Sequence, residues 1–134
     1  MSTFCRIAIE YPNNTFESIY CNYDGYFNDG VGEALTNHYN NTPKVIELIH
    51  GGNISSLGEK LYPGPGKHDK YNRQEGVTCF YHRDFGESLI EQKLEVSSNF
   101  EQFKNEYNDY DWIYIWNIDN EKWTCYRKWT EYKY

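Results

Sequence analysis

Alternation of apolar and polar residues marks the first part of the chain as a pair of strands. Residues 4–9 alternate with the period of a half-buried strand, and residues 18–23 alternate again after a Pro-Asn-Asn turn signal. Two alternating segments joined by a turn are typical of a β-hairpin. We therefore predict a hairpin with Cys5 and Cys21 on the apolar faces of its two strands.

Helical spacing of apolar residues follows. The first predicted helix runs from Val31 to Tyr39, where apolar side chains recur on one face. In the second, Thr42 supplies an N-cap, Pro43 stands at the first helical position and Gly51-Gly52 offers a left-handed cap. These signals predict two consecutive helices after the hairpin.

The middle of the chain is predicted to be a long loop. Prolines and glycines alternate after Leu61 and exclude regular structure, so a surface loop is expected up to about Gly76. Residues 77–83 then alternate and predict a third strand, with Cys79 in its apolar phase. Residues 88–96 fit either a short helix or a strand.

The last third combines one helix with an aromatic hairpin. Ser98-Asn99-Phe100-Glu101 is typical of a capping box, so a helix is expected after it. Residues 112–117 and 123–129 are rich in β-forming aromatic residues and flank a turn. Together the elements predict an α+β fold, a single domain over residues 1–134 with about five strands in a mostly antiparallel sheet and helices packed on one face.

Composition adds a hint of binding. Aromatic residues make up 19% of the 134 residues, with 14 Tyr, 7 Phe and 4 Trp, which exceeds the needs of a core and suggests a contact surface. The net charge of -7 argues against general nucleic-acid binding and makes a basic partner easier. The acidic residues are mildly concentrated at Glu101, Glu106, Asp109, Asp111, Asp119 and Glu121.

The four cysteines, Cys5, Cys21, Cys79 and Cys125, are spread along the chain without a Cys-x-x-Cys pair. That spacing fits neither a zinc site nor a disulfide scaffold, and each cysteine shares phase with apolar neighbours. We expect buried hydrophobes in a reducing cytoplasm, with no metal and no cofactor. No apolar run is long enough for a membrane span, so no membrane partner is expected.

One candidate ligand site surrounds the first glycines. Tyr23 to Tyr26 lead from a strand to Gly30-Val31-Gly32 at a helix start. Such a turn can leave backbone N–H groups free to hold a phosphate or carboxylate. The alternative is a structural turn that requires positive φ at Gly25 and close helix packing at Gly32.

A second candidate site combines the loop with the end of the third strand. The loop carries Lys67, His68, Lys70 and Arg73, and the strand ends at His82-Arg83-Asp84. Arg83 could form paired hydrogen bonds with a phosphate while aromatic rings stack a base. The alternative is a surface ion pair of Arg83 with Asp84 or Glu87.

The order and spacing of several motifs resemble a family of small proteins encoded by bacterial phages and prophages. The motifs are Ile19-Tyr20-Cys21-Asn22-Tyr23-Asp24-Gly25-Tyr26, Gly30-Val31-Gly32, Ile54-Ser55-Ser56-Leu57-Gly58, Arg83-Asp84 and Gly86-Glu87. The family usually has His-Trp at Asn22-Tyr23. The resemblance covers residues 4–87 and implies an accessory protein of a phage or mobile element, a class that often counters host defence in the bacterial cytoplasm.

These patterns lead to three functional hypotheses. The first is a non-catalytic sponge that sequesters a nucleotide-type signal in a homo-oligomer, and the second is a direct, anti-CRISPR-like inhibitor that uses an acidic, aromatic surface. The third, an enzyme that degrades the signal, is disfavoured because no catalytic motif is present. The predicted ligand-binding residues are Tyr23, Asp24, Gly25, Tyr26, Gly30, Gly32, Lys67, His68, Arg73, His82 and Arg83.

Overall fold

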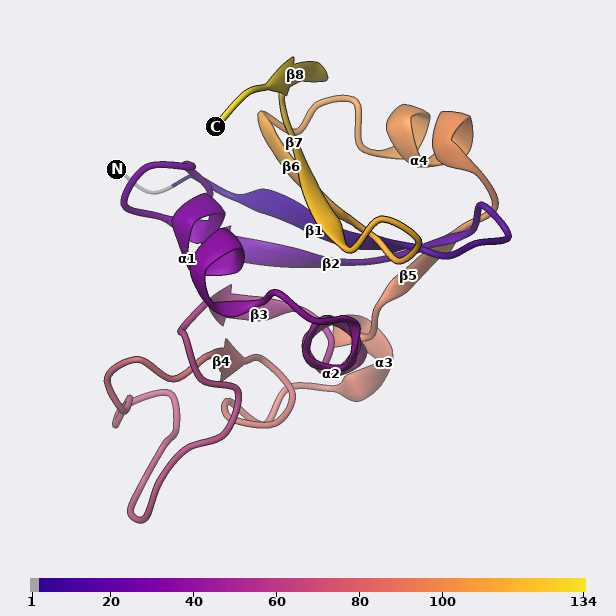
Figure 1. Ribbon diagram of the computed structural model, residues 1–134. Helices are drawn as coiled ribbons and strands as arrows, with labels where there is room; N and C mark the ends of the chain where they lie inside the picture. The colour runs from indigo at the N-terminus through magenta and orange to yellow at the C-terminus, as the bar shows by residue number, and fades with distance from the viewer. Residues whose placement is uncertain (1–2) are drawn as a thin grey trace.

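The computed structural model describes residues 3–134, which form one mixed β-sheet with helices on both faces (Figure 1). In chain order the elements are β1 (Cys5–Glu10), β2 (Phe16–Tyr23), α1 (Val31–His38), α2 (Thr42–His50), β3 (Ile54–Ser56), β4 (Cys79–Phe80), α3 (Leu89–Gln92), β5 (Glu95–Ser97), α4 (Phe100–Glu106), β6 (Trp112–Asn117), β7 (Lys122–Arg127) and β8 (Thr130–Tyr132). The predicted α+β class is confirmed.

The sheet has eight strands rather than about five. It is mixed, with five antiparallel pairings, in keeping with the predicted mostly antiparallel character, and two parallel pairings that were not predicted. The strand order is β4-β3-β2-β1-β6-β7-β8, and β5 pairs with the first half of β2. β1 is antiparallel to β2 but parallel to β6, and β2 is parallel to β3. Parallel pairs join segments far apart in the sequence, and periodicity along one segment carries no information on such a partner.

Both predicted hairpins are confirmed, and the second one gains a strand. β1 pairs with β2 and β6 pairs with β7, both antiparallel. β8 folds back on β7 through Lys128 and Trp129, which both have positive φ. This backbone conformation is rare outside glycine, asparagine and aspartate, so the sequence carried no turn signal there.

The predicted strand at residues 77–83 is largely wrong, because only β4 forms. Asp84 ends it: its carboxylate accepts a hydrogen bond from the N–H of Phe80 at 2.8 Å, and its own N–H donates to the carbonyl of Phe80 at 3.0 Å. The ambiguous residues 88–96 contain both alternatives, with α3 followed by the start of β5.

The helix caps differ by one residue from the prediction. The N-cap of α2 is Asn41, whose side chain accepts a hydrogen bond from the N–H of Lys44 at 2.9 Å, so Thr42 is already helical. Gly52 has the expected left-handed φ of 87°. In α4 the capping residue is Asn99, which accepts from the N–H of Gln102 at 2.8 Å.

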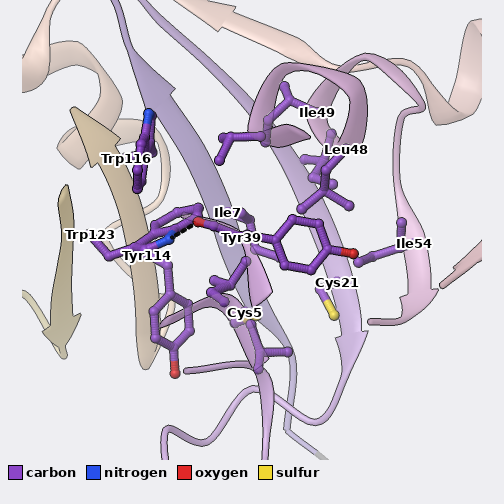
Figure 2. Packing of buried hydrophobic residues seen from close by; sticks show 14 of the residues in the cluster. Cys5, Ile7, Cys21, Tyr39, Leu48, Ile49, Ile54, Tyr114, Trp116 and Trp123 are labelled. Atoms are coloured by element: carbon purple, nitrogen blue, oxygen red, sulfur yellow. Dashed lines mark hydrogen bonds between the residues drawn. The ribbon is translucent and has the colours of Figure 1, made fainter. Parts of the chain in front are cut away.

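The larger core lies between the sheet and the first two helices. Odd-numbered residues of β1 and even-numbered residues of β6 point to α1 and α2, and they meet side chains such as Leu48 and Ile49 (Figure 2). Tyr39 ties this core together: its carbonyl accepts the indole N–H of Trp123 at 2.9 Å, and its hydroxyl donates to the carbonyl of Gly58 at 2.8 Å. The C-terminal end of helix α1 is thereby fixed to both β7 and the segment that follows β3.

The opposite face carries a second, smaller core, so the prediction of helices on one face is wrong. α4 covers this face, and its Phe103 stacks on Phe16 of β2 with ring centroids 4.9 Å apart. Buried Arg6 donates to the hydroxyls of Ser18 at 2.9 Å and Tyr107 at 3.0 Å. Because side chains of β1 and β6 alternate between the two faces of the sheet, both faces carry buried apolar residues, and both faces need helices to cover them.

All four cysteines are buried and free, as predicted. Three of them converge in the larger core, because Cys5 lies opposite Cys21 in the β1–β2 pairing and Cys125 lies on β7 beside Tyr114. Burial, and then the neighbouring thiols of Cys21 and Cys125, raise the pKa of Cys5.

None of the helices in residues 3–134 has the length and apolar character needed to span a membrane.

We expect stability to fall at alkaline pH. Burial raises the pKa of the Tyr39 hydroxyl from 10.0 to about 12 and that of the Cys125 thiol from 9.0 to about 12. Between pH 9 and 12 the unfolded chain therefore binds fewer protons than the folded chain, and the free energy of unfolding decreases as pH rises. Urea unfolding at successive pH values measures this decrease. Cys125→Ala should make it shallower, and a flat profile up to pH 11 would contradict the expectation.

Candidate functional site

The predicted site residues fall into three separate groups. Asp24 to Gly32 form the turn into α1 and its first residues, His68 and Arg83 both contact the buried carboxylate of Asp84, and Arg73 contacts Tyr23 at the end of β2. Lys67 is an exposed residue of the long loop, and the Nδ1–H of His82 donates a hydrogen bond to the carbonyl of Glu87 at 2.7 Å.

The N–H groups at the start of α1 are already hydrogen bonded. The N–H groups of Val31, Gly32 and Glu33 donate to the carbonyls of Asp24 (2.9 Å), Tyr26 (3.3 Å) and Phe27 (3.0 Å). The preceding loop thus caps the helix with its own carbonyl oxygens. The expectation that these amides are free to hold an anion is wrong.

Close packing explains the glycines of this turn. A Cβ atom on Gly25 would lie 2.8 Å from the carbonyl oxygen of Phe4, and one on Gly32 would lie 2.2 Å from the ring of Phe27. Gly25 does not have positive φ, so that part of the structural alternative is wrong, whereas the close packing at Gly32 is confirmed. The glycines let the loop fold tightly onto both β1 and α1.

Contacts within the protein occupy most of the N–H donors of Arg83. Its guanidinium forms a bidentate pair with Asp84 at 2.7 and 2.9 Å and donates to the carbonyls of Leu61 at 2.6 Å and Thr78 at 3.1 Å. It also lies over the ring of Phe80, 4.6 Å from its centroid. The predicted alternative, an ion pair with Asp84, is the one that forms, and it leaves the guanidinium few free donors.

His68 lies beneath this pair and holds the long loop. Its ring is almost fully buried, and its Nδ1 accepts the N–H of Gln74 at 3.0 Å. Its Nε2 faces the carbonyl of Thr78 at 3.2 Å and the carboxylate of Asp84 at 3.4 Å. Because Nδ1 is an acceptor, Nε2 carries the proton of the neutral ring. The contacts of His68 are those of a residue that anchors the loop to β4.

Arg73 contacts Tyr23, the last residue of β2. The guanidinium of Arg73 donates to the hydroxyl of Tyr23 at 2.7 Å and lies over the ring of Phe85, 5.0 Å from its centroid. No contact links this group with Arg83 among residues 3–134. The two predicted arginines therefore have separate partners.

A pocket of about 340 Å³ lies at the end of the sheet beside the turn into α1. Its lining comes from that turn and from the C-terminal strands: Tyr26, Phe27, Asn28, Trp112, Arg127 and Tyr132. Only Tyr26 was predicted as a site residue. The volume is at the lower end of the range for pockets that hold small ligands.

Arg127 is the distinctive side chain of this pocket. Its guanidinium lies over the indole ring of Trp112, 5.4 Å from the centroid. The side chain is exposed, and it forms neither a hydrogen bond nor an ion pair with any residue from 3 to 134. Arg127 thus keeps its N–H donors available while its guanidinium lies against the face of an aromatic ring.

The aromatic walls of the pocket are held in place by the fold. Tyr132 meets Trp112 edge to face at 5.1 Å and Phe27 at 5.4 Å. The carbonyls of Tyr26 and Phe27 are bound to the first turn of α1. Tyr26 leaves 43% of its surface exposed, so its ring is available for stacking. The arrangement suits a planar, anionic molecule.

Sequence reasoning missed the part of the pocket supplied by the last strands. One signal was present: Arg127 is in phase with Trp123 and Cys125, so a charged side chain occupies an apolar phase at the end of a strand.

A larger hollow of about 590 Å³ is lined by Glu33, His38, Glu59 and Glu75 among others. Within residues 3–134 no three histidine, cysteine or carboxylate side chains are grouped to hold a metal ion.

Comparison of the chain with protein-family models, with curated proteins and with solved structures found no match. Function is therefore inferred from the geometry of the chain itself.

Asp84→Ala should destabilise the protein, because it leaves Arg83 and the N–H of Phe80 without their partner. We expect the free energy of urea unfolding to fall by about 2 to 4 kcal/mol. Limited proteolysis should then cut the loop between Lys60 and Gly76 faster. Lys70→Ala, an exposed change in the same loop, is the control and should alter neither measurement. Equal stability of Asp84→Ala and the unmutated protein would contradict the anchoring role.

Proposed function

We propose that this protein binds a nucleotide-type small molecule, without transforming it, in the pocket formed by Tyr26, Trp112, Arg127 and Tyr132. The observation that carries the proposal is the exposed guanidinium of Arg127, stacked over Trp112 at 5.4 Å and without a partner in residues 3–134. An arginine held in this way can form two parallel hydrogen bonds with a phosphate. The half-exposed ring of Tyr26 offers a face for a base.

Charge sets the kind of ligand that the pocket can accept. The protein carries a net charge of -7, so a long polyanion is repelled, whereas a small anion needs only a local cation. Asn28 adds amide donors and acceptors that can bind the edge of a base. The lining contains no carboxylate, histidine or cysteine. These features support capture of a small nucleotide.

The resemblance to small phage and prophage proteins supports a biological setting for such capture. A protein that sequesters a signalling nucleotide of a host defence system acts by removing the signal and requires no turnover. The ligand would then leave the protein intact when the protein is heated. This sponge activity is the function that we propose for the chain.

A panel of nucleotides, including cyclic and ADP-ribose-type molecules, tests the proposal by thermal melting and isothermal titration calorimetry. We expect at least one of them to raise the melting temperature, since a ligand at 100 times its dissociation constant stabilises the folded state by about 2.7 kcal/mol. Arg127→Ala should weaken binding by about 10- to 100-fold. Mass spectrometry after heating should recover the ligand unchanged.

Arg73→Ala is the matched control for this experiment, because Arg73 also lies over an aromatic ring but outside the pocket. It should leave the affinity unchanged. Absence of any stabilising nucleotide would overturn the proposal. Equal loss of affinity in the Arg73 and Arg127 variants would move the site away from this pocket.

Direct inhibition of a defence effector through an acidic, aromatic surface stays a prediction. Glu106, Asp109 and Asp111 on and after α4 are exposed, as such a surface requires. Binding to a basic effector should weaken with salt and with reversal of these charges more than with changes at Arg83.

A further inference from the structure

The sheet face that α4 covers is only partly covered. Beyond α4, five aromatic side chains remain half-buried or exposed on this face: Phe4, Tyr20, Tyr81, Phe85 and Tyr110, here called the aromatic strip. Tyr20 shares its side of β2 with Phe16 and Ser18, which contact α4 and Arg6. Aromatic side chains that cluster in partly exposed positions are typical of interaction sites.

The aromatic strip consists of two ring clusters that meet at Asn53. Phe85 meets Tyr81 edge to face at 5.6 Å, and Phe4 contacts Tyr20 at 5.9 Å and Tyr110 at 4.9 Å. Asn53 joins the two halves, because its side chain accepts the N–H of Tyr20 at 2.9 Å and its carbonyl accepts the N–H of Tyr81 at 3.1 Å. Burial, and then the neighbours Tyr81 and Tyr110, raise the pKa of the Tyr20 hydroxyl, as expected for the centre of the strip.

Charges of opposite sign lie at the two ends of the aromatic strip. From Lys60 to Gly76 the loop carries four cations and two carboxylates, and Arg73 lies over Phe85 at one end of the strip. From Glu95 to Asp111 the chain carries five carboxylates and one lysine, and Asp109 and Asp111 flank Tyr110 at the other end. In Figure 1 the loop and α4 lie at opposite corners of the molecule.

This arrangement selects one occupant. A basic partner would leave the cationic end facing like charge, and an acidic partner would do the same at the carboxylate end. A second copy of the chain, rotated by a two-fold axis near Tyr20, sets each end against its opposite. Such isologous contacts are the commonest in soluble homo-oligomers, with aromatic residues at the centre and charged residues at the rim.

We propose that the aromatic strip is the interface of a two-fold symmetric homodimer, in which Arg73 of one copy faces Asp109 and Asp111 of the other. This interface lies on the opposite sheet face from the pocket of Arg127, so it stands independently of nucleotide binding. Dimerisation leaves both pockets open.

Sedimentation equilibrium and light scattering at moderate salt test the proposal. The unmutated protein should have twice the 16.0 kDa mass of the chain. Arg73→Glu, and separately Asp109→Lys with Asp111→Lys, should each raise the dimer dissociation constant at least tenfold. Tyr20→Ser should do the same without a charge change. Circular dichroism verifies the fold of each variant, and the changed arginine and aspartates are exposed.

Mixing the two charge-reversed proteins gives the decisive result. Each copy in the mixed dimer then meets opposite charge at both ends, so the mixture should associate as tightly as the unmutated protein. Asp119→Lys with Lys122→Glu, in the exposed β6–β7 turn, is the control and should change nothing. A monomeric unmutated protein overturns the proposal, and so does a dimer that survives both charge reversals.

Discussion

The pairing of β1 with β2 on one side and β6 on the other is the constraint on which the rest of the structure depends. β1 is buried from Cys5 to Ile9, and it joins a strand that follows it directly to one about a hundred residues later. Since β6 is parallel to β1, the intervening chain must cross from one end of the sheet to the other. Odd residues of β1 then support α1 and α2, while even residues support α4.

Local pattern was enough to predict the two hairpins and the three longer helices, but not the short strands or the order of the strands in the sheet. The hairpins β1–β2 and β6–β7 and the helices α1, α2 and α4 follow from periodicity and capping residues, which act within one segment. The parallel partner of β1 and the short strands β3 and β5 follow from long-range packing. β8 depends on a left-handed backbone conformation at Lys128 and Trp129. Neither residue type favours this conformation, so the sequence did not indicate the turn.

The candidate site was predicted in part for the same reason. The turn around Tyr26 was identified from its glycines, yet Arg127 and Trp112 reach it through a sheet whose strand order was unknown. Arg83 and His68 looked available because their partners are largely backbone carbonyls and N–H groups, which no side-chain pattern reveals. A charged residue in an apolar phase, as at Arg127, was the better indicator of a free functional group.

The distribution of the four thiols gives the molecule two independent reporters of internal motion. Cys5, Cys21 and Cys125 share the larger core, whereas Cys79 lies beside His68 where the long loop is attached. A detachment of the loop exposes Cys79 alone, and only disruption of the sheet exposes the other three. The rate at which a thiol reagent modifies one sulfur, compared with the rate for the remaining three, therefore separates local opening from global unfolding in the same sample.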